Sequence, residues 1–227
     1  FKRDRAVFED LLYQNIRQAG GQTGANTQAP TGLMLGTGVR VVATEKQHAQ
    51  GNMVNTTNPL DLAIAGEGFF QVAQPDGTIG YTRDGNFKLS NTGQIVTASG
   101  ALLQPAITIP TTASTVTFGR DGTVSIELTA GGSQVIGQIQ LARFVNPSGL
   151  ESKGQNLMKE TPASGAPQIL QPGTTGAGSL MQGTLEASNV NVVEEMVNMI
   201  ETQRAYEINS KAISAVDGML KFINNNL

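Results

Sequence analysis

Cysteine and tryptophan are absent from this chain of 227 residues, and charged, aromatic and histidine side chains are scarce. Without cysteine the chain has no disulfide and no thiolate metal site. Charged residues make up 15% of the chain and the net charge is −3, so we predict no binding to nucleic acid through basic patches. No run of about 18 apolar residues occurs, and we therefore predict no membrane insertion.

The sequence offers little that would support catalysis. Its single histidine, His48, lies in EKQHAQGN, and no Gly-x-Ser-x-Gly segment accompanies it. The segments GEGFF (66–70) and GTGV (36–39) lack the third glycine of a dinucleotide-binding fingerprint. We therefore predict that His48 is a surface or loop residue and that the protein is not an enzyme and has no cofactor. A hydrolase with His48 as its base is a distant alternative.

Three aspartates stand directly before glycine, at Asp76, Asp84 and Asp121. An Asp-Gly pair between two β-prone segments favours a hairpin, because glycine adopts a positive φ without steric strain. The three carboxylates would also suit a calcium ion if they converged. Their regular position before glycine favours turns, and we predict no metal site.

The composition favours a turn-rich β protein, since glycine is frequent, with 27 residues, and aromatic residues make up only 5%. In LDLAI (60–64) the apolar residues alternate as on one face of a strand, and GQIQLARF (137–144) is typical of another strand. We predict a mainly β fold: a turn-rich antiparallel β domain over 56–187, an extended N-terminal region over 1–55, and one long amphipathic helix over 188–227.

The N-terminal region is the least regular part of the sequence. Apolar residues in VFEDLLYQNIRQA (7–19) approach helical spacing and predict a short helix, with an irregular extended segment as the alternative. The stretch from Gly20 through Pro30 to Gly38 has no charged residue and is rich in glycine. It predicts a loop or a loose hairpin without a core of its own.

The C-terminal region has the signals of a long helix. Asn191 is suited to cap a helix N-terminus, and Glu194 is placed to reach back as in a capping box. No proline follows, and a helix from about 191 to 223 would be roughly 50 Å long at about 1.5 Å per residue.

This helix carries an apolar stripe that Arg204 interrupts and that Val216 and Leu220 widen. A stripe of this length needs a partner of similar length. The chain's own β domain is one candidate, but we favour an upstream helix, the same helix of other copies, or both. The predicted assembly interface consists of Val193, Met196, Val197, Ile200, Ile208, Ala212, Ala215, Met219, Phe222 and Ile223.

The same residues resemble a known family. LEASNVNVVEEMVNMIETQRAYEINSKAI (185–213) is similar to the C-terminal signature of the flagellar rod, hook and hook-associated proteins. NPLDLAIAGEGFFQV (58–72) and YTRDGNFKLSNTGQIVTASG (81–100) resemble the family's central signature, and FKR (1–3) resembles the end of its N-terminal signature. PTGLMLGTGVRVVATEKQHAQGNM (30–53) and GLESKGQNL (149–157) are most similar to the distal-rod branch.

The resemblance implies a structural subunit of the bacterial flagellar distal rod, exported without a cleaved signal by the type III apparatus. It implies polymerisation with copies of itself into a stiff helical tube that transmits torque from motor to hook and carries the export channel. Implied partners are the proximal rod and hook proteins, and the basal-body ring proteins as a bushing. An N-terminal helix, which would precede Phe1, pairs in the family with the C-terminal helix at the inner wall, with the β domain outside.

Within this resemblance, Gly20–Gly38 corresponds to a rod-specific insertion that hook relatives lack, and it would stiffen the tube by wedging between subunits. A competing interpretation of the sequence is a secreted β-domain binding or adhesion module whose helix is a stalk. The absence of tryptophan and the presence of only three tyrosines argue against sugar binding.

Overall fold

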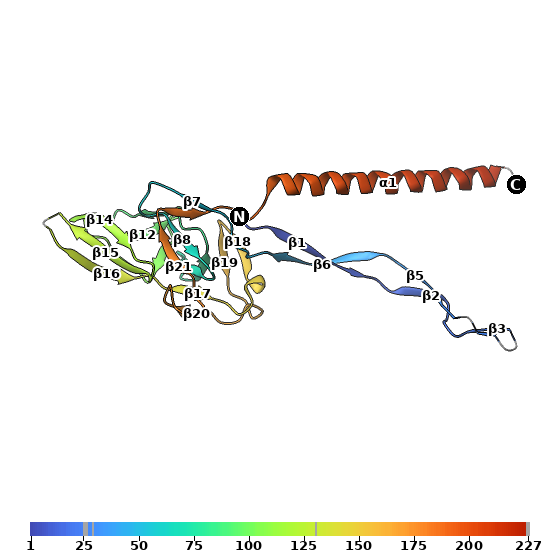
Figure 1. Cartoon of the computed structure of the whole chain (residues 1–227), viewed down its shortest axis with the longest axis horizontal. Coiled ribbons are helices and arrows are strands. Elements are labelled where there is room, and N and C mark those ends of the chain that lie inside the picture. The colour runs from blue at the N-terminus through green and yellow to red at the C-terminus, as the bar shows by residue number, and fades with distance from the viewer. Residues whose placement is uncertain (25–26, 29, 130, 226–227) are drawn as a thin grey trace. The chain divides into compact units, whose positions relative to one another are not determined.

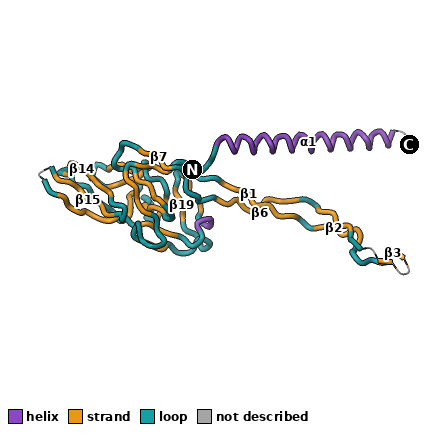
Figure 2. Tube along the Cα trace, viewed as in Figure 1, coloured by secondary structure: helices purple, strands orange, loops and turns teal. Residues whose placement is uncertain are grey.

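A computed structural model of the chain describes residues 1–24, 27–28, 30–129 and 131–225. The chain divides into two compact units, Phe1–Ser188 and Asn189–Leu227. The first unit is built from β-strands and the second from one long helix, as the colouring of Figure 2 shows. The prediction of a mainly β, antiparallel fold with a single long C-terminal helix is confirmed.

The first unit begins with a long two-stranded antiparallel ribbon (Figure 1). Three successive strand pairs form it, and short irregular steps separate them. The pairs are β1 (Asp4–Asp10) with β6 (Val39–Lys46), β2 (Tyr13–Arg17) with β5 (Leu33–Gly36), and β3 (Gln22–Gly24) with β4 (Thr27–Gln28).

The ribbon corrects the prediction of a short helix in the N-terminal region, which is wrong. Val7 lies in β1 opposite Ala43, and Tyr13 lies in β2 opposite Gly36. The strands take their hydrogen bonds from residues far along the chain, and apolar spacing within one segment does not report such partners. The predicted loose hairpin is found at the ribbon's end, although residues 25, 26 and 29 lie outside the described residues.

Beyond the ribbon, the chain folds into a β body of short antiparallel strands. Its largest sheet has nine strands in the order β11-β12-β13-β9-β10-β19-β18, with β17 pairing both β9 and β20. These strands are β9 (Phe69–Ala73), β10 (Ile79–Thr82), β11 (Phe87–Leu89), β12 (Ile95–Thr97), β13 (Leu102–Gln104), β17 (Leu141–Arg143), β18 (Glu151–Gly154), β19 (Leu157–Lys159) and β20 (Gln168–Leu170).

Smaller sheets complete the body. A three-stranded meander contains β14 (Ala113–Phe118), β15 (Thr123–Leu128) and β16 (Ser133–Gln138). Two antiparallel pairs join β8 (Leu62–Ala65) to β21 (Ser179–Gln182) and β7 (Met53–Asn55) to β22 (Thr184–Glu186). A single 3-10 turn, η1 (Pro147–Gly149), precedes β18.

Hairpins are found at two of the three Asp-Gly pairs for which they were predicted. Asp76-Gly77 lies between the paired strands β9 and β10, and Asp121-Gly122 lies between β14 and β15. Asp84-Gly85 does not form a hairpin, because β10 pairs with β9 and β19 whereas β11 pairs with β12. A Cβ at Gly85 would lie 1.6 Å from the carbonyl oxygen of Leu62, so this glycine allows a close backbone approach instead.

Two strand predictions also need correction. Residues 137–144 are not one strand, because β16 ends at Gln138 and the Ile139 amide donates to the Gly122 carbonyl at 2.8 Å before β17 begins. In β8 Leu62, Ala63 and Ile64 are all buried, so both faces of this strand are covered and the expected alternation is lost.

The main core of the body gathers residues from most of its strands, including Leu62, Phe70, Phe87, Ile126 and Leu141. A second cluster contains Phe69, Tyr81, Ala142, Phe144 and Met158. Burial of these large side chains is the main source of the body's stability.

The second unit is the helix α1 (Val192–Asn225). It begins directly after Asn191, whose side-chain oxygen accepts a hydrogen bond from the Val193 amide at 3.1 Å. The helix from about 191 to 223 is confirmed, while the reciprocal bond of Glu194 stays a prediction. No residue of α1 is buried. Among the described residues no helix is both long and apolar enough to cross a membrane.

Candidate assembly surfaces

The predicted stripe lies exposed along α1. Ile200 is 49% exposed and Phe222 is 70% exposed, and the other residues of the stripe are exposed as well. At about 100° per residue, the stripe occupies roughly half of the helix circumference. Arg204 falls in its middle, as the sequence indicated. The structure thus places these residues on one broad side of α1, and their role in assembly stays a prediction.

A second apolar line on α1 was missed when the helix was analysed for spacings of three and four residues. It recurs every seven residues, and we call it the heptad line. Taking every seventh residue divides 192–223 into seven sets. Six of these sets include at least one charged or strongly polar side chain, and the set that begins at Val192 includes none. The heptad line consists of Val192, Met199, Tyr206, Ile213 and Leu220, all of them exposed.

The heptad line and the stripe lie on opposite sides of the helix. Tyr206 and Ile208 are two residues apart, so they point about 200° apart around the axis. The same spacing separates Ile213 from Ala215 and Leu220 from Phe222. Leu220 therefore belongs with the heptad line and does not widen the stripe. The helix presents apolar residues on two sides, which is unlike a helix that covers a single partner.

A line that repeats every seven residues drifts by about 20° per heptad around a straight α-helix. A left-handed supercoil removes this drift and keeps the line against one partner helix. The heptad line therefore favours a helical partner over a flat sheet. Reading α1 in steps of seven residues is the sequence signal that would have found it.

The ribbon is a further exposed apolar surface. It carries large apolar side chains on both strands, with Leu12 87% exposed. Gly20, Pro30 and Gly38 mark the stretch that the sequence singled out, and it contains β3, β4 and β5. Gly38 has φ 130° and its carbonyl accepts the Leu11 amide at 2.9 Å, so this glycine permits the irregular step between β5 and β6.

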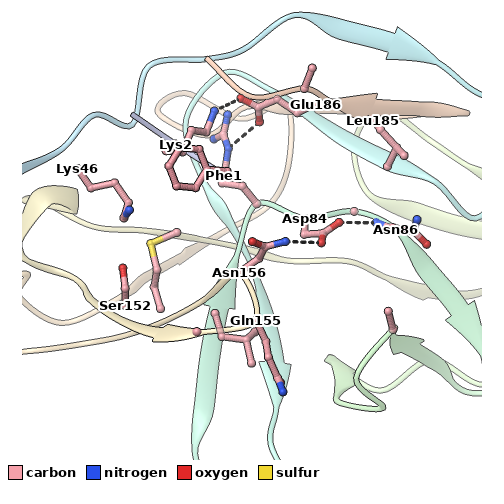
Figure 3. Close-up of a pocket in the computed structure, with 17 residues that line it drawn as sticks. Phe1, Lys2, Lys46, Asp84, Asn86, Ser152, Gln155, Asn156, Leu185 and Glu186 are labelled. Atoms are coloured by element: carbon pink, nitrogen blue, oxygen red, sulfur yellow. Dashed lines mark hydrogen bonds and ion pairs between the residues drawn. The ribbon is translucent and has the colours of Figure 1, made fainter. Parts of the chain in front are cut away.

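At the base of the ribbon, three ionic side chains form a buried cluster that the sequence did not reveal, and Figure 3 shows two of them, Lys2 and Glu186, joined by an ion pair. The Glu186 carboxylate pairs with the Lys2 ammonium and accepts a hydrogen bond from Arg83 Nε at 3.0 Å. Burial acts to raise the pKa of Glu186, but hydrogen bonds from Lys2 and the Gly51 amide and the charge of Arg83 lower it overall. We call Lys2, Arg83 and Glu186 the junction triad.

His48 lies in a loop, as predicted, but it is half-buried. Its ring meets Phe69 edge to face at 5.5 Å between centroids, and its buried Nδ1 makes no hydrogen bond. Burial lowers its pKa, the charges of Arg83, Lys2 and Lys46 lower it further, and a hydrogen bond to the Pro147 carbonyl opposes them. The ring is therefore held neutral near pH 7 beside cations, where it packs against Phe69.

The three aspartates act in their own turns. The side chain of Asp76 accepts the Thr78 amide at 3.0 Å, that of Asp84 accepts the Asn86 amide at 3.1 Å, and that of Asp121 accepts the Thr123 amide at 3.1 Å. Within the described parts of the chain, no group of three or more histidine, aspartate or glutamate side chains is placed to hold a metal.

A cleft of about 470 Å³ opens next to the junction triad. Figure 3 shows Asp84, Asn156 and Leu185 at its wall together with Phe1. Its lining mixes charged, amide and apolar groups.

Comparison with known proteins completes this description. Residues 63–126, from β8 into β15, match the family described as flagellar hook protein FlgE/F/G D1 domain. Residues 181–226, which include α1, match the flagellar basal body rod FlgEFG protein C-terminal family. The flagellar basal-body rod protein FlgG of Buchnera aphidicola from Acyrthosiphon pisum is 56% identical over 97% of this chain and 85% of its own length.

The chain belongs to the flagellar basal-body rod protein family. The FlgG rod protein of Caulobacter vibrioides is 48% identical over 97% of this chain and 85% of its own, and that of Bacillus subtilis is 39% identical over 99% and 86%. As a flagellar basal-body rod protein, the chain is a structural subunit located in the rod of the basal body.

Proposed function

We propose that this rod protein polymerises into the stiff helical tube of the distal rod, which turns as a drive shaft and encloses the export channel. Its partners are further copies of itself, the proximal rod and hook proteins at the two ends of the tube, and the basal-body ring proteins as a bushing. The protein acts as a mechanical element without catalysis. In this proposal region 1–55 carries the ribbon and ends with β7, which belongs to the β body, region 56–187 is an outer β layer, and region 188–227 is an inner helical layer.

One observation carries this proposal: α1 is a 34-residue helix with no buried residue and with apolar side chains on two opposite sides. Fully burying one large apolar side chain contributes about 1.5–3 kcal/mol. The stripe and the heptad line together offer enough such residues to offset the estimated 4–15 kcal/mol lost on association. Two apolar sides allow each helix to lie between neighbours, which suits a filament built from contacts that do not close into a ring.

The alternative of a secreted binding or adhesion module with a helical stalk has less support. A stalk exposed to water would be polar on all sides. In α1, by contrast, Val197, Ile200 and Tyr206 lie in exposed positions.

Ile200→Asp in the full-length protein tests the proposal. The substitution places a charge in the stripe, so we expect the β body to stay folded and rod assembly to fail, with loss of motility. Asn198→Asp is the matched control, because it adds the same charge at a nearby polar position of α1. Electron microscopy of basal bodies and swimming assays give the outcome. Motile cells with complete rods in the Ile200→Asp strain would show that the stripe is not an assembly surface.

A further inference from the structure

Glu186 joins segments that lie far apart in the sequence. Its Oε1 pairs with the Lys2 ammonium and accepts the Gly51 backbone amide at 2.9 Å, and its Oε2 accepts Arg83 Nε at 3.0 Å. The exposed fractions of the side chains are 4% for Glu186, 9% for Lys2 and 11% for Arg83. The carboxylate is thus enclosed and accepts hydrogen bonds from three donors.

Lys2, the first cation of the triad, links the two ends of the ribbon where they meet the β body. Lys2 stands two residues before β1, and its ammonium also donates to the Ala49 carbonyl at 2.9 Å. Ala49 lies in the segment that follows β6. Both strands of the ribbon are therefore tied to Glu186 where they enter the β body.

The second cation reaches into the body. Arg83 follows β10, and its Nη1 donates to the carbonyls of Gly66 and Gly68, each at 2.8 Å. These two glycines form the connection between β8 and β9, the strands that supply much of the main core. The planar guanidinium serves all three acceptors at once, which a lysine ammonium at this position would not do.

Glu186 itself ends β22, two residues before the first unit ends at Ser188. The ladder between β22 and β7 has only three residue pairs. The covalent route by which α1 can load the first unit runs through the backbone that follows Glu186. A short ladder alone would resist shear weakly, so the triad reinforces the point at which force enters.

We propose that the junction triad is a mechanical joint that fixes the ribbon base, the β body and the strand leading to α1 in one geometry. The proposal rests on the shaft function above. Buried ion pairs contribute little net stability but impose directional hydrogen bonds, and loss of one partner leaves an uncompensated charge. The joint therefore serves stiffness more than folding stability.

The first test measures hydrogen exchange in the isolated full-length chain. In Glu186→Gln the Gly51 amide loses its charged acceptor, and we expect it to exchange about tenfold faster or more. The Thr56 amide, which donates to the Gly183 carbonyl at 2.7 Å beside the same strands, is the internal control and keeps its protection. This measurement does not depend on whether the chain forms a shaft. An unchanged rate at Gly51 would show that Glu186 does not hold this segment and would overturn the joint.

The second test measures swimming in a medium of raised viscosity. We compare Arg83→Lys, which keeps the charge but loses the bonds to Gly66 and Gly68, with Ile126→Val, a core change remote from the joint. The control must match Arg83→Lys in melting temperature. If Ile126→Val does not match it, Val124→Ala, a larger core change, takes its place.

We expect rods of normal number in all strains, with swimming under load reduced at least about twofold in Arg83→Lys relative to the control of equal stability. Equal swimming of the two strains would overturn the joint and leave the triad a stability element only. Failure of the assembly role proposed for α1 in the shaft would appear differently, as motility that survives Ile200→Asp.

Discussion

The backbone of Gly51 lies directly against that of Ala187, and a Cβ placed on residue 51 would be 2.0 Å from the Ala187 carbonyl oxygen. The same region is held by the Ala187 amide, which donates to the Asn52 carbonyl at 2.8 Å. Gly51 does not have a positive φ, so the requirement here is space and not backbone conformation. The close approach leaves no room for a larger residue at position 51 beside Ala187, which follows β22.

Gly51→Ala is therefore expected to push the segment before β7 away from Ala187 and to lower the free energy of unfolding by about 1–3 kcal/mol. Chemical denaturation of the full-length chain measures this change. Gly36→Ala is the control, because its Cβ would meet the Tyr13 ring at an ordinary 3.4 Å. A stability of Gly51→Ala equal to that of the unmodified chain would mean that the two segments separate freely.

His48 predicts a pH dependence of the first unit. Its pKa lies below the ordinary 6.5 in the folded state, so the unfolded chain takes up the proton first. The stability that the folded chain gains by keeping His48 neutral is therefore complete above pH 6.5 and declines as the pH falls below that value. We expect a lower melting temperature at pH 5.5 than at pH 8, and a smaller difference in His48→Gln. An equal difference in the two proteins would assign the effect to other groups. The pKa of Glu186 is lowered, so its contribution to stability is present above its ordinary 4.5 and is lost only as the pH falls below that value, outside this pH range.

The helix should be the least protected part of the isolated chain. A helix without buried residues is marginal in water even at good length, so amides in 192–225 should exchange quickly while those of the β body, from about 50 to 187, are protected. Gly218→Ala, where a Cβ meets nothing within 4 Å, should slow this exchange modestly, since it favours the helix by about 1 kcal/mol. Strong protection of Val193–Ile223 in a dilute monomer would show that α1 packs on its own chain.

Ile213 tests the heptad line. Removing most of a buried isoleucine side chain destabilises a contact by about 2 kcal/mol or more, and at about 1.4 kcal/mol per tenfold this equals about 30-fold in affinity. Ile213→Ala should therefore raise the concentration needed for polymerisation about 30-fold. Ser214→Ala, at the next position and off the line, should change it little. Polymerisation of Ile213→Ala at the unmodified concentration would restrict assembly to the stripe.

The sequence predicted features whose cause is local. The start of α1 follows from Asn191 as a cap, and its length follows from the lack of proline. The hairpins at Asp76 and Asp121 follow from turn chemistry. Such features depend on residues a few positions apart, and they can be derived without knowledge of the fold.

Features that depend on distant partners were missed. The ribbon pairs Tyr13 with Gly36, so the spacing of apolar residues in 7–19 gave the wrong element. The junction triad joins Lys2 to Glu186 across 184 positions, and no pattern in the sequence marks that pairing. The heptad line is different, because it was visible in the sequence and was overlooked only for want of a seven-residue comparison.

The ribbon's end provides the last prediction. The stretch Gly20–Gly38 has no charged residue, so it can be buried between subunits without the penalty of desolvating a charge. A two-stranded ribbon is at best marginally stable alone, and contacts with neighbouring subunits would order this stretch in the filament.

Removing residues 21–37 deletes β3, β4 and β5 but leaves the pairing of β1 with β6. Loop-closure entropy changes slowly with length, so the monomer should lose about 1 kcal/mol of stability or less. The body and α1 stay intact, and the subunits should still be exported and polymerise. If this stretch wedges between neighbouring subunits, as the resemblance implies, the tube should bend more easily without it, and curvature of isolated rods in electron micrographs measures this. A variant of full length with Leu33, Met34 and Leu35 changed to serine separates apolar contact from length, since it should soften the tube as well. A bending stiffness equal to that of the intact rod in both variants would reduce the stretch to a surface loop.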